Sequence, residues 1–595
     1  MKNRNVCLIT ASLLTLVLLL ASCGTPEATT APANTAAGTT AAGTITPMAT
    51  TKPAAEKPKY GGIFVAAQTA DTSAFDASTQ FDLMGWQISV TNEALLQGDW
   101  AKGPAGTGET DWTANHQGQT KMLTGWLAEG YELTAPDTII LHIKKGVKWW
   151  SKPPANGREF TADDVVWNLK TQWANPGGNF ANFFPAPEEK LLSVEALDKY
   201  TVELKFTPTK QGIQILESGA RAYMMLPELY PNQKDWKNAL GTGAFMLVDY
   251  VSATSMTFKK NPNYHGTDPA GPGKGNQLPY IDELRFPVIP DLSTQQAAFR
   301  TGKIDVLGNQ SPEDFEEMQS HTGWKFEYKQ AYGFFNLPTG RQDKDLPFKD
   351  IRVRQAMNLA VDKVAIARDF YEGKADVLGY PYNKGPGLKA YYTLLEELPA
   401  FVQELVKGGN PEKAKQLLKD AGYPNGFKTV IGATPNDVDI LSIVKADLAK
   451  ANIDMEIKVY EVGVARGIDR ARTWDQMWFK NAKQSALPHY MFEMRPESND
   501  SAAFWDSPET RAVYNEIQKW LGIDDSKWSK SLKDVTPFVL ESSFAIWMPA
   551  PYRYSIWQPW VKNYYGAVSL GAFLPYHHTY YNWIDTDLKA STMGR

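Results

Sequence analysis

The hydrophobic and polar positions of this chain follow different periods in different segments. In Thr201–Phe206, apolar residues alternate with Glu203 and Lys205. This period of two is typical of a half-buried strand, with one face toward a core and the other toward solvent. Ile139–Ile143 is a second short run rich in β-branched residues. Both segments are therefore predicted to be strands.

Other segments have the period of an amphipathic helix. From about Asp350 onward, Val353 and Met357 recur at the spacing of one helical face. Asn410-Pro411 is typical of a helix start, and Gly422 is typical of the end of the same helix. The mixture of the two periods, without internal repeats, predicts an α/β architecture.

A hydrophobic run, Leu8–Leu20, follows a short segment that contains Lys2 and Arg4. The small residues after it lead to Cys23 and resemble a bacterial lipobox, in which the cysteine is lipidated and the preceding segment is removed. A bilayer-spanning helix needs about 20 apolar residues, and this run has polar residues near its start; an uncleaved anchor helix is the alternative. We therefore expect a signal peptide over residues 1–22. Lipidated Cys23 would hold the exported protein at the outer face of the cytoplasmic membrane.

Residues 23–59 are dominated by Thr, Ala, Pro and Gly and contain no aromatic residue. Such a segment cannot bury enough apolar surface to offset its chain entropy, so a disordered tether is predicted, with folded sequence beginning at Tyr60. The two cysteines of the chain are Cys7 and Cys23. Because Cys7 leaves with the signal peptide, the exported protein would have neither a disulfide nor a catalytic cysteine.

Length and composition narrow the class of protein. A chain of 595 residues exceeds the size at which a single core stops growing, so at least two lobes are expected. A net charge of −5 and a pI of 5.9 give no basic footprint for nucleic acid. Aromatic residues make up 12% of the chain; they suit ligand pockets, although core packing accounts for most of them.

Four separated segments carry motifs, and each is explained locally by helix caps and tight turns. Thr161 can cap a helix, and Gly241 and Gly243 permit either backbone conformations or close backbone approaches that a side chain would forbid. The four segments are Leu141–Trp149 with Phe160–Val166, Gly241–Phe245 with Lys260–Tyr264, Pro347–Ala356 with Ala360–Lys363, and Asn410–Tyr423. Together, and in this order, they resemble the family 5 extracellular solute-binding proteins of ABC importers, the oligopeptide- and dipeptide-binding type.

The resemblance implies a two-lobed periplasmic-binding-protein-like fold that closes around its ligand by a hinge. The chain would cross between lobes near Arg285–Pro290 and return near Ser543–Pro551. The implied parts are lobe one over residues 60–288 with an inserted subdomain at about 95–235, lobe two over 289–542, and a return to lobe one over 543–595.

The resemblance also implies a monomeric substrate-binding lipoprotein that needs no cofactor. It would capture a peptide-like solute outside the cell and deliver it to the transmembrane subunits of an ABC permease. The sequence has no GxSxG, HExxH or P-loop motif and no GxGxxG after a strand, so no enzyme activity is expected. A secreted hydrolase stays open as the alternative, because carboxylates cannot be paired from sequence alone. His577-His578 is the only adjacent histidine pair, and neighbours in sequence rarely face one metal, so no metal site is expected.

The ligand itself is less well defined by the sequence. In peptide-binding relatives, an aspartate in a loop of lobe two pairs with the amino terminus of the peptide. The matching segment here, between Asp475 and Glu493, contains no acid and has Lys480 and Gln484 instead. A buried ammonium without a counter-charge is costly. A neutral oligosaccharide stacked on Trp478 is therefore the alternative to a peptide.

The candidate ligand contacts are aromatic and amide residues. Tyr332–Asn336 resembles the family's strand near the cleft, with Asn336 ending it, and Trp547 and Tyr552 lie at the return connection between the lobes. Core packing competes with the ligand role at each position. The candidates are Trp86, Tyr332, Asn336, Trp478, Gln484, Trp547 and Tyr552.

Overall fold

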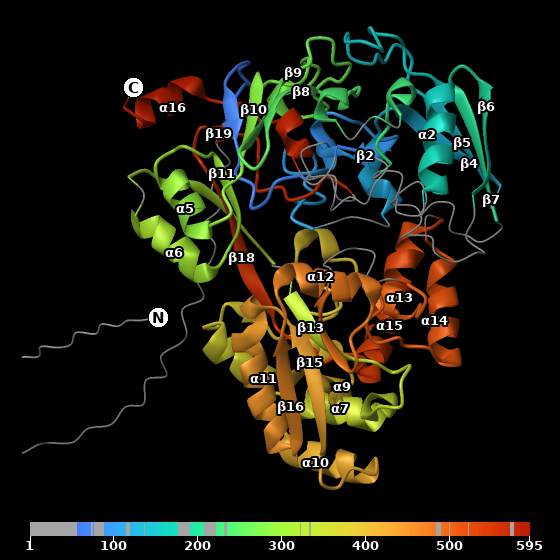
Figure 1. Ribbon diagram of the computed structural model, residues 1–595, viewed down its shortest axis with the longest axis vertical. Coiled ribbons are helices and arrows are strands. Elements are labelled where there is room, and N and C mark those ends of the chain that lie inside the picture. The colour runs from blue at the N-terminus through green and yellow to red at the C-terminus, as the bar shows by residue number, and fades with distance from the viewer. Residues whose placement is uncertain are drawn as a thin grey trace, which may run out of the picture. The chain divides into compact units, whose positions relative to one another are not determined.

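The computed structural model divides into two units, residues 1–54 and 55–595 (Figure 1). It describes residues 56–594, apart from 73–74, 77–88, 115–118, 136, 176–190, 208–221, 231, 233–234, 322, 333–334, 483–489, 499, 522 and 572–575. The predicted signal peptide, Cys23 and nearly all of the tether lie outside these residues. Within the described residues, no helix combines the length and hydrophobicity needed to cross a membrane.

The first sheet is built mainly from strands that are close in sequence. Its order is β1 (Ile63–Val65), β10 (Glu283–Pro287), β9 (Ser255–Lys260) and β8 (Phe245–Val251). β1 runs parallel to β10, and the other pairs are antiparallel. The sheet packs in a core that also takes in C-terminal residues such as Trp560 and Trp583, so the end of the chain returns to this lobe.

A second antiparallel sheet forms between β1 and β8 in sequence. Its order is β4 (Ala128–Ala135), β5 (Thr138–Ile143), β7 (Thr201–Phe206) and β6 (Leu191–Asp198), and α2 (Ala162–Ala174) packs against it. Both predicted strands are confirmed, because Ile139–Ile143 lies in β5 and the apolar side chains of β7 are buried. The short strands β2 (Leu96–Gly98) and β3 (Leu123–Gly125) form a separate pair.

A third sheet brings together segments from the middle and the end of the chain. β18 (Ala550–Trp557) pairs with β11 (Val306–Gln310), β12 (Glu327–Tyr332) and the short β14 (Ala375–Asp376). Next to β11 lie α5 (Leu292–Arg300) and α6 (Pro312–His321) (Figure 1). Their small core packs against Val65 and Ala67 of the first strand region.

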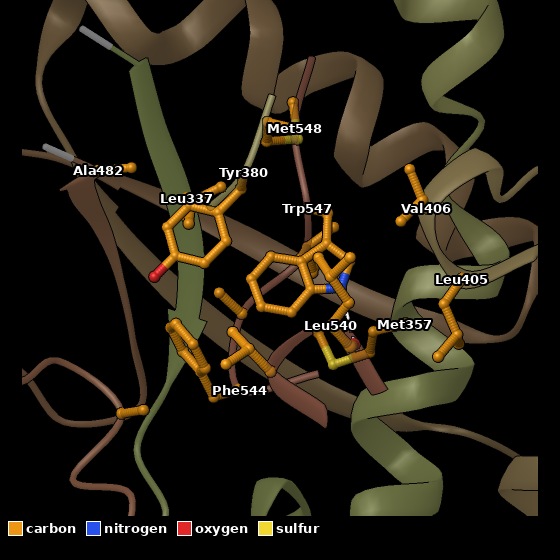
Figure 2. Close-up of a cluster of buried hydrophobic side chains, with 14 of the residues drawn as sticks. Leu337, Met357, Tyr380, Leu405, Val406, Ala482, Leu540, Phe544, Trp547 and Met548 are labelled. Atoms are coloured by element: carbon orange, nitrogen blue, oxygen red, sulfur yellow. Dashed lines mark hydrogen bonds between the residues drawn. The ribbon is translucent and has the colours of Figure 1, made fainter. Parts of the chain in front are cut away.

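The fourth sheet has the order β13 (Phe335–Gly340), β17 (Met477–Ala482), β15 (Phe427–Ala433) and β16 (Ile453–Val459). β15 is parallel to both β16 and β17, and β13 is antiparallel to β17. Its core includes the three helices α7 (Ile351–Ala360), α9 (Ala400–Lys407) and α11 (Val438–Lys450) and the aromatic cluster of Figure 2. The remaining helices and strands are α8 (Lys363–Ala365), α10 (Pro411–Asp420), α12 (Val462–Ala471), α13 (Tyr490–Glu493), α14 (Pro508–Gln518), α15 (Asp525–Ser542), α16 (Thr586–Thr592), β19 (Val561–Lys562) and β20 (Trp583–Ile584).

The predicted helix starts are confirmed. Asn410 caps α10 by accepting from the backbone N–H of Lys413, with Pro411 as the first helical residue. Asp350 caps α7 in the same way. Thr161 is the N-cap of α2, and its backbone N–H donates to the Asp164 carboxylate at 3.0 Å.

The predicted lobe boundaries at 288/289 and 542/543 remain a prediction. The hydrophobic cores favour a first boundary later in the chain than residue 288. Residues 299–318 pack with β18 and β1, whereas Leu337 belongs to the core of the fourth sheet. Trp547 and Met548 still belong to that core, and Trp557 to the core of the first sheet. Two segments therefore connect the two cores, β12 to β13 and the strand β18.

Candidate ligand-binding region on the connecting strands

Tyr332 and Tyr552, both candidates from the sequence, lie directly opposite each other on β12 and β18. Their rings meet edge to face with centroids 5.7 Å apart. Both hydroxyls donate to the carboxylate of Asp376 on β14, at 2.7 Å from Tyr332 and 3.3 Å from Tyr552. All three side chains are half-buried.

Burial raises the pKa of the Tyr332 hydroxyl well above its usual value, and the neighbouring Asp376 carboxylate raises it further. Burial and the same carboxylate also raise the pKa of Tyr552. Both phenols therefore stay neutral at physiological pH and act as hydrogen-bond donors. Lys384 approaches the carboxylate at 3.5 Å from an exposed position, so Asp376 has both donors and a counter-charge.

A second polar group lies at the edge of the fourth sheet. Because β15, β16 and β17 are parallel, their carboxyl ends share one edge, which is where open α/β sheets bind ligands. Asn336 of β13 faces Asn481 of β17 there, and the Asn481 amide donates to Asn336 at 3.3 Å. The Asn336 amide donates in turn to Asp437 at 3.3 Å. This edge of the sheet therefore presents the amides of Asn336 and Asn481 and the carboxylate of Asp437. Asn336 follows Tyr332 by four residues in the sequence.

The strand assignment around Asn336 differs from the sequence prediction. Asn336 was expected to end the strand that contains Tyr332, but β12 ends at Tyr332 and Asn336 lies near the start of β13. Asp437 belongs to the short 3₁₀ helix η12 (Pro435–Asp437), where it accepts from the backbone N–H and the hydroxyl of Thr434.

Trp478 and Trp547, two further candidates, are core residues in this structure. Trp478 is 5% exposed and stacks on Trp474, with centroids 5.6 Å apart. Trp547 is 2% exposed, stacks on Tyr380 at 5.1 Å and donates its indole N–H to the Leu540 carbonyl (Figure 2). The indole rings of Trp478 and Trp547 are both covered by protein, so neither ring can stack on a ligand in this structure. Both side chains pack in the core.

Lys480 was expected in the segment that matches the acidic loop of lobe two in relatives, but it lies within strand β17. Its ammonium group is buried and contacts Asp469 of α12 at 2.8 Å. Burial disfavours its charge, yet Asp469 and more distant carboxylates hold the pKa above the ordinary value. Glu493 of α13 is fully buried and accepts from the backbone N–H groups of Ala502 and Ala503.

The remaining candidates Trp86, Gln484 and Cys23 lie outside the described residues. Two carboxylates of the region, Asp376 and Asp437, were not identified from the sequence. The spacing Thr434 to Asp437 indicates a helix cap but not a ligand contact. Asp376 carries no local signal, since only the pairing of β14 with β18 brings it to the two tyrosines.

The adjacent histidines are buried against aromatic rings. His577 meets Trp126 edge to face at 4.1 Å, and His578 lies 4.5 Å from the ring of Tyr564. Burial lowers the pKa of each imidazole to about 3, so both are neutral. Among the described residues, no group of three or more His, Cys, Asp or Glu side chains is arranged to hold a metal ion.

Sequence comparisons match most of the chain to one family. The profile of the bacterial extracellular solute-binding proteins, family 5 Middle, matches residues 122–505. Heme-binding protein A of Haemophilus influenzae is 29% identical over 362 residues, 56% of this chain and 61% of the relative. The dipeptide-binding protein of Escherichia coli is 29% identical over 374 residues, 58% of this chain and 65% of the relative. The matched segments thus span less than two thirds of either relative.

Solved structures match over a larger part of the chain. The periplasmic binding protein DppA of Helicobacter pylori, in complex with the peptide STSA, has a TM-score of 0.66 at 20% identity, covering 89% of this chain and 99% of its own. The oligopeptide-binding protein AppA of Bacillus subtilis, in complex with a nonapeptide, has a TM-score of 0.66 at 19% identity, covering 89% and 100%. The chain therefore belongs to the family 5 bacterial extracellular solute-binding proteins and has their two-lobed α/β fold.

Proposed function

We propose that this protein is the substrate-binding component of an ABC importer and captures a peptide-like solute outside the cell for a membrane permease. The observation that carries the proposal is the family match over residues 122–505. The half-buried polar groups on and beside the two connecting segments, Tyr332, Asn336 and Tyr552, support it. We propose that a solute held between the lobes contacts these groups, because pockets at domain interfaces are common ligand sites.

A peptide-like solute is favoured over the alternatives. Relatives are named for dipeptides, and structural neighbours hold a tetrapeptide or a nonapeptide, although one relative is named for heme. The oligosaccharide alternative depended on an open Trp478 face, and that face is covered by Trp474. A secreted hydrolase is not favoured, since the family is one of binding proteins, and we propose that the solute is released unchanged.

We expect weak discrimination of a free amino terminus. Among the carboxylates of the region, Asp437 already accepts from Thr434 and Asn336, and Asp376 accepts from two phenols. A ligand ammonium would have to share either carboxylate with these donors, which reduces the gain from the counter-charge.

The test is calorimetric titration of the purified protein with di- and tripeptides and with their N-acetylated forms. Binding of peptides, with little loss on acetylation and with peptides recovered intact, would support the proposal. Asn336→Ala should weaken binding about 3- to 10-fold, as expected for one lost hydrogen bond. The matched control Asn263→Ala changes an exposed asparagine of another lobe and should have no effect. Product formation in proportion to the pure protein would contradict a binding function.

We further propose that the protein is exported and lipidated at Cys23. The basic residues before Leu8–Leu20 and the small residues before Cys23 support this. Cys23→Ala should leave the precursor unprocessed or release the protein from the membrane fraction, measured by fractionation and intact mass. Unchanged membrane retention of the variant, with a lipid mass at another position, would contradict it.

A further inference from the structure

Asp525, the first residue of α15, makes a direct contact with a distant part of the chain. Its carboxylate accepts a hydrogen bond from the Thr120 hydroxyl at 3.2 Å and another from the backbone N–H of Lys121 at 3.1 Å. Both donors lie in the short 3₁₀ helix η3 (Thr120–Met122). The two hydrogen bonds therefore join segments that are far apart in the sequence.

The two sides of this contact belong to different cores. Met122, the last residue of η3, is buried in the core of the first sheet. Trp528 of α15, about one turn after Asp525, is buried in the core of the fourth sheet. Ala114, which precedes η3, also packs against the core of the fourth sheet. The contact thus bridges the two cores away from β12, β13 and β18, the strands that connect them.

Helix capping does not account for the carboxylate of Asp525. The N-cap of α15 is Asp524, which accepts from the backbone N–H groups of Ser526 and Lys527. The carboxylate of Asp525 is bound to the donors of η3 instead. The first turn of a helix favours a negative charge, and hydrogen bonds to a charged acceptor are stronger than neutral ones. Its position at the start of α15 is therefore suited to holding another part of the molecule.

The contact lies where it can open and re-form. Thr120 and Asp525 are half-buried and Lys121 is exposed, so water can replace each partner when the two segments separate. The net gain from such hydrogen bonds is modest for that reason. A bend where the connecting strands pass Tyr332 and Tyr552 would part η3 from α15 without disturbing either core.

From this geometry we infer that Asp525 and η3 form a latch that favours the closed arrangement of the lobes, so that ligand-free molecules already populate it. The inference goes beyond the proposed function, because it concerns the balance between open and closed molecules before any solute binds. The latch lowers the free energy that a solute must supply to close the lobes. It therefore raises the affinity for every solute by one common factor.

The experiment uses the full-length protein without solute. Hydrogen–deuterium exchange reports on the Lys121 amide, and small-angle scattering gives the radius of gyration. Asp525→Ala removes the acceptor, Asp525→Asn keeps one acceptor oxygen, and Thr120→Val removes the hydroxyl donor at nearly constant shape. Asp534→Ala is the matched control, because Asp534 is an exposed carboxylate of the same helix that pairs with Lys530. Thermal unfolding verifies that each variant is folded.

The Lys121 amide should exchange about 3- to 10-fold faster in Asp525→Ala than in the wild-type protein, as expected for the loss of a modest net stabilisation. The radius of gyration of this variant should increase, and Asp525→Asn and Thr120→Val should lie between the two. Asp534→Ala should match the wild type. Equal exchange in the wild-type protein and Asp525→Ala, or faster exchange in the variant at an unchanged radius of gyration, would overturn the latch.

These readouts need no solute, so they stand whether or not the protein binds peptides. With any solute that does bind, Asp525→Ala should weaken the affinity by the same factor as with every other solute, measured by calorimetry. Factors that differ between solutes would place Asp525 at the ligand and contradict the latch.

Discussion

Glu493 is a carboxyl group enclosed by the protein, and its titration should be visible in stability. Burial raises its pKa from 4.5 to about 7, although backbone donors and Lys480 oppose that rise. A raised folded-state pKa means that the native state holds the proton more tightly than the unfolded state does. The contribution of Glu493 to the free energy of unfolding is therefore largest below about pH 4.5. It falls as the pH rises through 7, by about 3 kcal/mol in all.

Glu493→Gln mimics the protonated form and should remove this pH dependence. The free energy of unfolding of wild type minus variant, measured by urea denaturation, should fall between pH 4.5 and 7.5. Glu497→Gln changes an exposed neighbour and should keep the wild-type profile. A difference that stays constant over this range would show that Glu493 is already ionised at low pH.

Trp547 contributes to stability through its packing on Tyr380 and its bond to Leu540. Trp547→Ala should lower the free energy of unfolding by about 3–5 kcal/mol, as large-to-small changes in a core do. Val464→Ala, at a side chain 53% exposed, should change it by less than about 0.5 kcal/mol. Weaker solute binding by Trp547→Ala at unchanged stability would instead place this indole at the ligand.

The type of a residue indicates whether it could contact a ligand, but it does not indicate whether its side chain is exposed in the folded protein. Tyr332, Tyr552 and Asn336 were identified from sequence, and the structure brings them to the connecting segments. Trp478 and Trp547 were identified on the same grounds but are buried, because their exposure depends on how Trp474 and Tyr380 pack against their rings. Burial of this kind is a tertiary property that the local pattern does not contain.

At the scale of elements, the two glycines of the Gly241–Gly243 motif are explained by a close backbone approach, one of the two explanations open from the sequence. A Cβ atom on Gly241 would lie 1.9 Å from the Thr91 carbonyl oxygen, and one on Gly243 would lie 2.7 Å from it. The backbone N–H of Gly243 donates to the same oxygen at 2.9 Å. The motif therefore fixes how this loop meets residues 90–92.

Gly241→Ala should destabilise the protein by about 1–3 kcal/mol, because the added methyl group has to push two backbone segments apart. Gly130→Ala in β4 is the control, since a Cβ atom there meets nothing within 4 Å. Chemical denaturation of both variants checks the difference. An equal, small effect at the two positions would mean that the loop relaxes without cost.

Local sequence patterns predicted individual helices and strands more reliably than they predicted which distant strands pair with each other. Strand β7 and the caps of α7 and α10 follow from alternation and capping chemistry, which depend on a few neighbouring residues. The pairing of β18 with β11, β12 and β14 joins segments more than 170 residues apart, and no local signal specifies it. The contacts of Asp376 depend on that pairing, so they could not be predicted either.

At the scale of the whole molecule, the two cores are joined by β12 leading into β13 and by β18. Tyr332 at the end of β12 lies beside Tyr552 on β18, so both connections pass through one place. A bend there would move one core against the other while each keeps its own packing, which is the hinge mode of domain closure.

We therefore predict that solute binding closes the lobes and lowers the radius of gyration. Small-angle scattering of the full chain, with and without a saturating peptide identified by calorimetry, measures this change. A peptide that shows no calorimetric binding is the control and should leave the profile unchanged. Closure costs conformational freedom, so a ligand can drive it only by contacting both lobes more favourably in the closed state. Asn336→Ala should therefore reduce the extent of closure at equal ligand concentration, and an unchanged profile for the wild-type protein at saturation would exclude closure on binding.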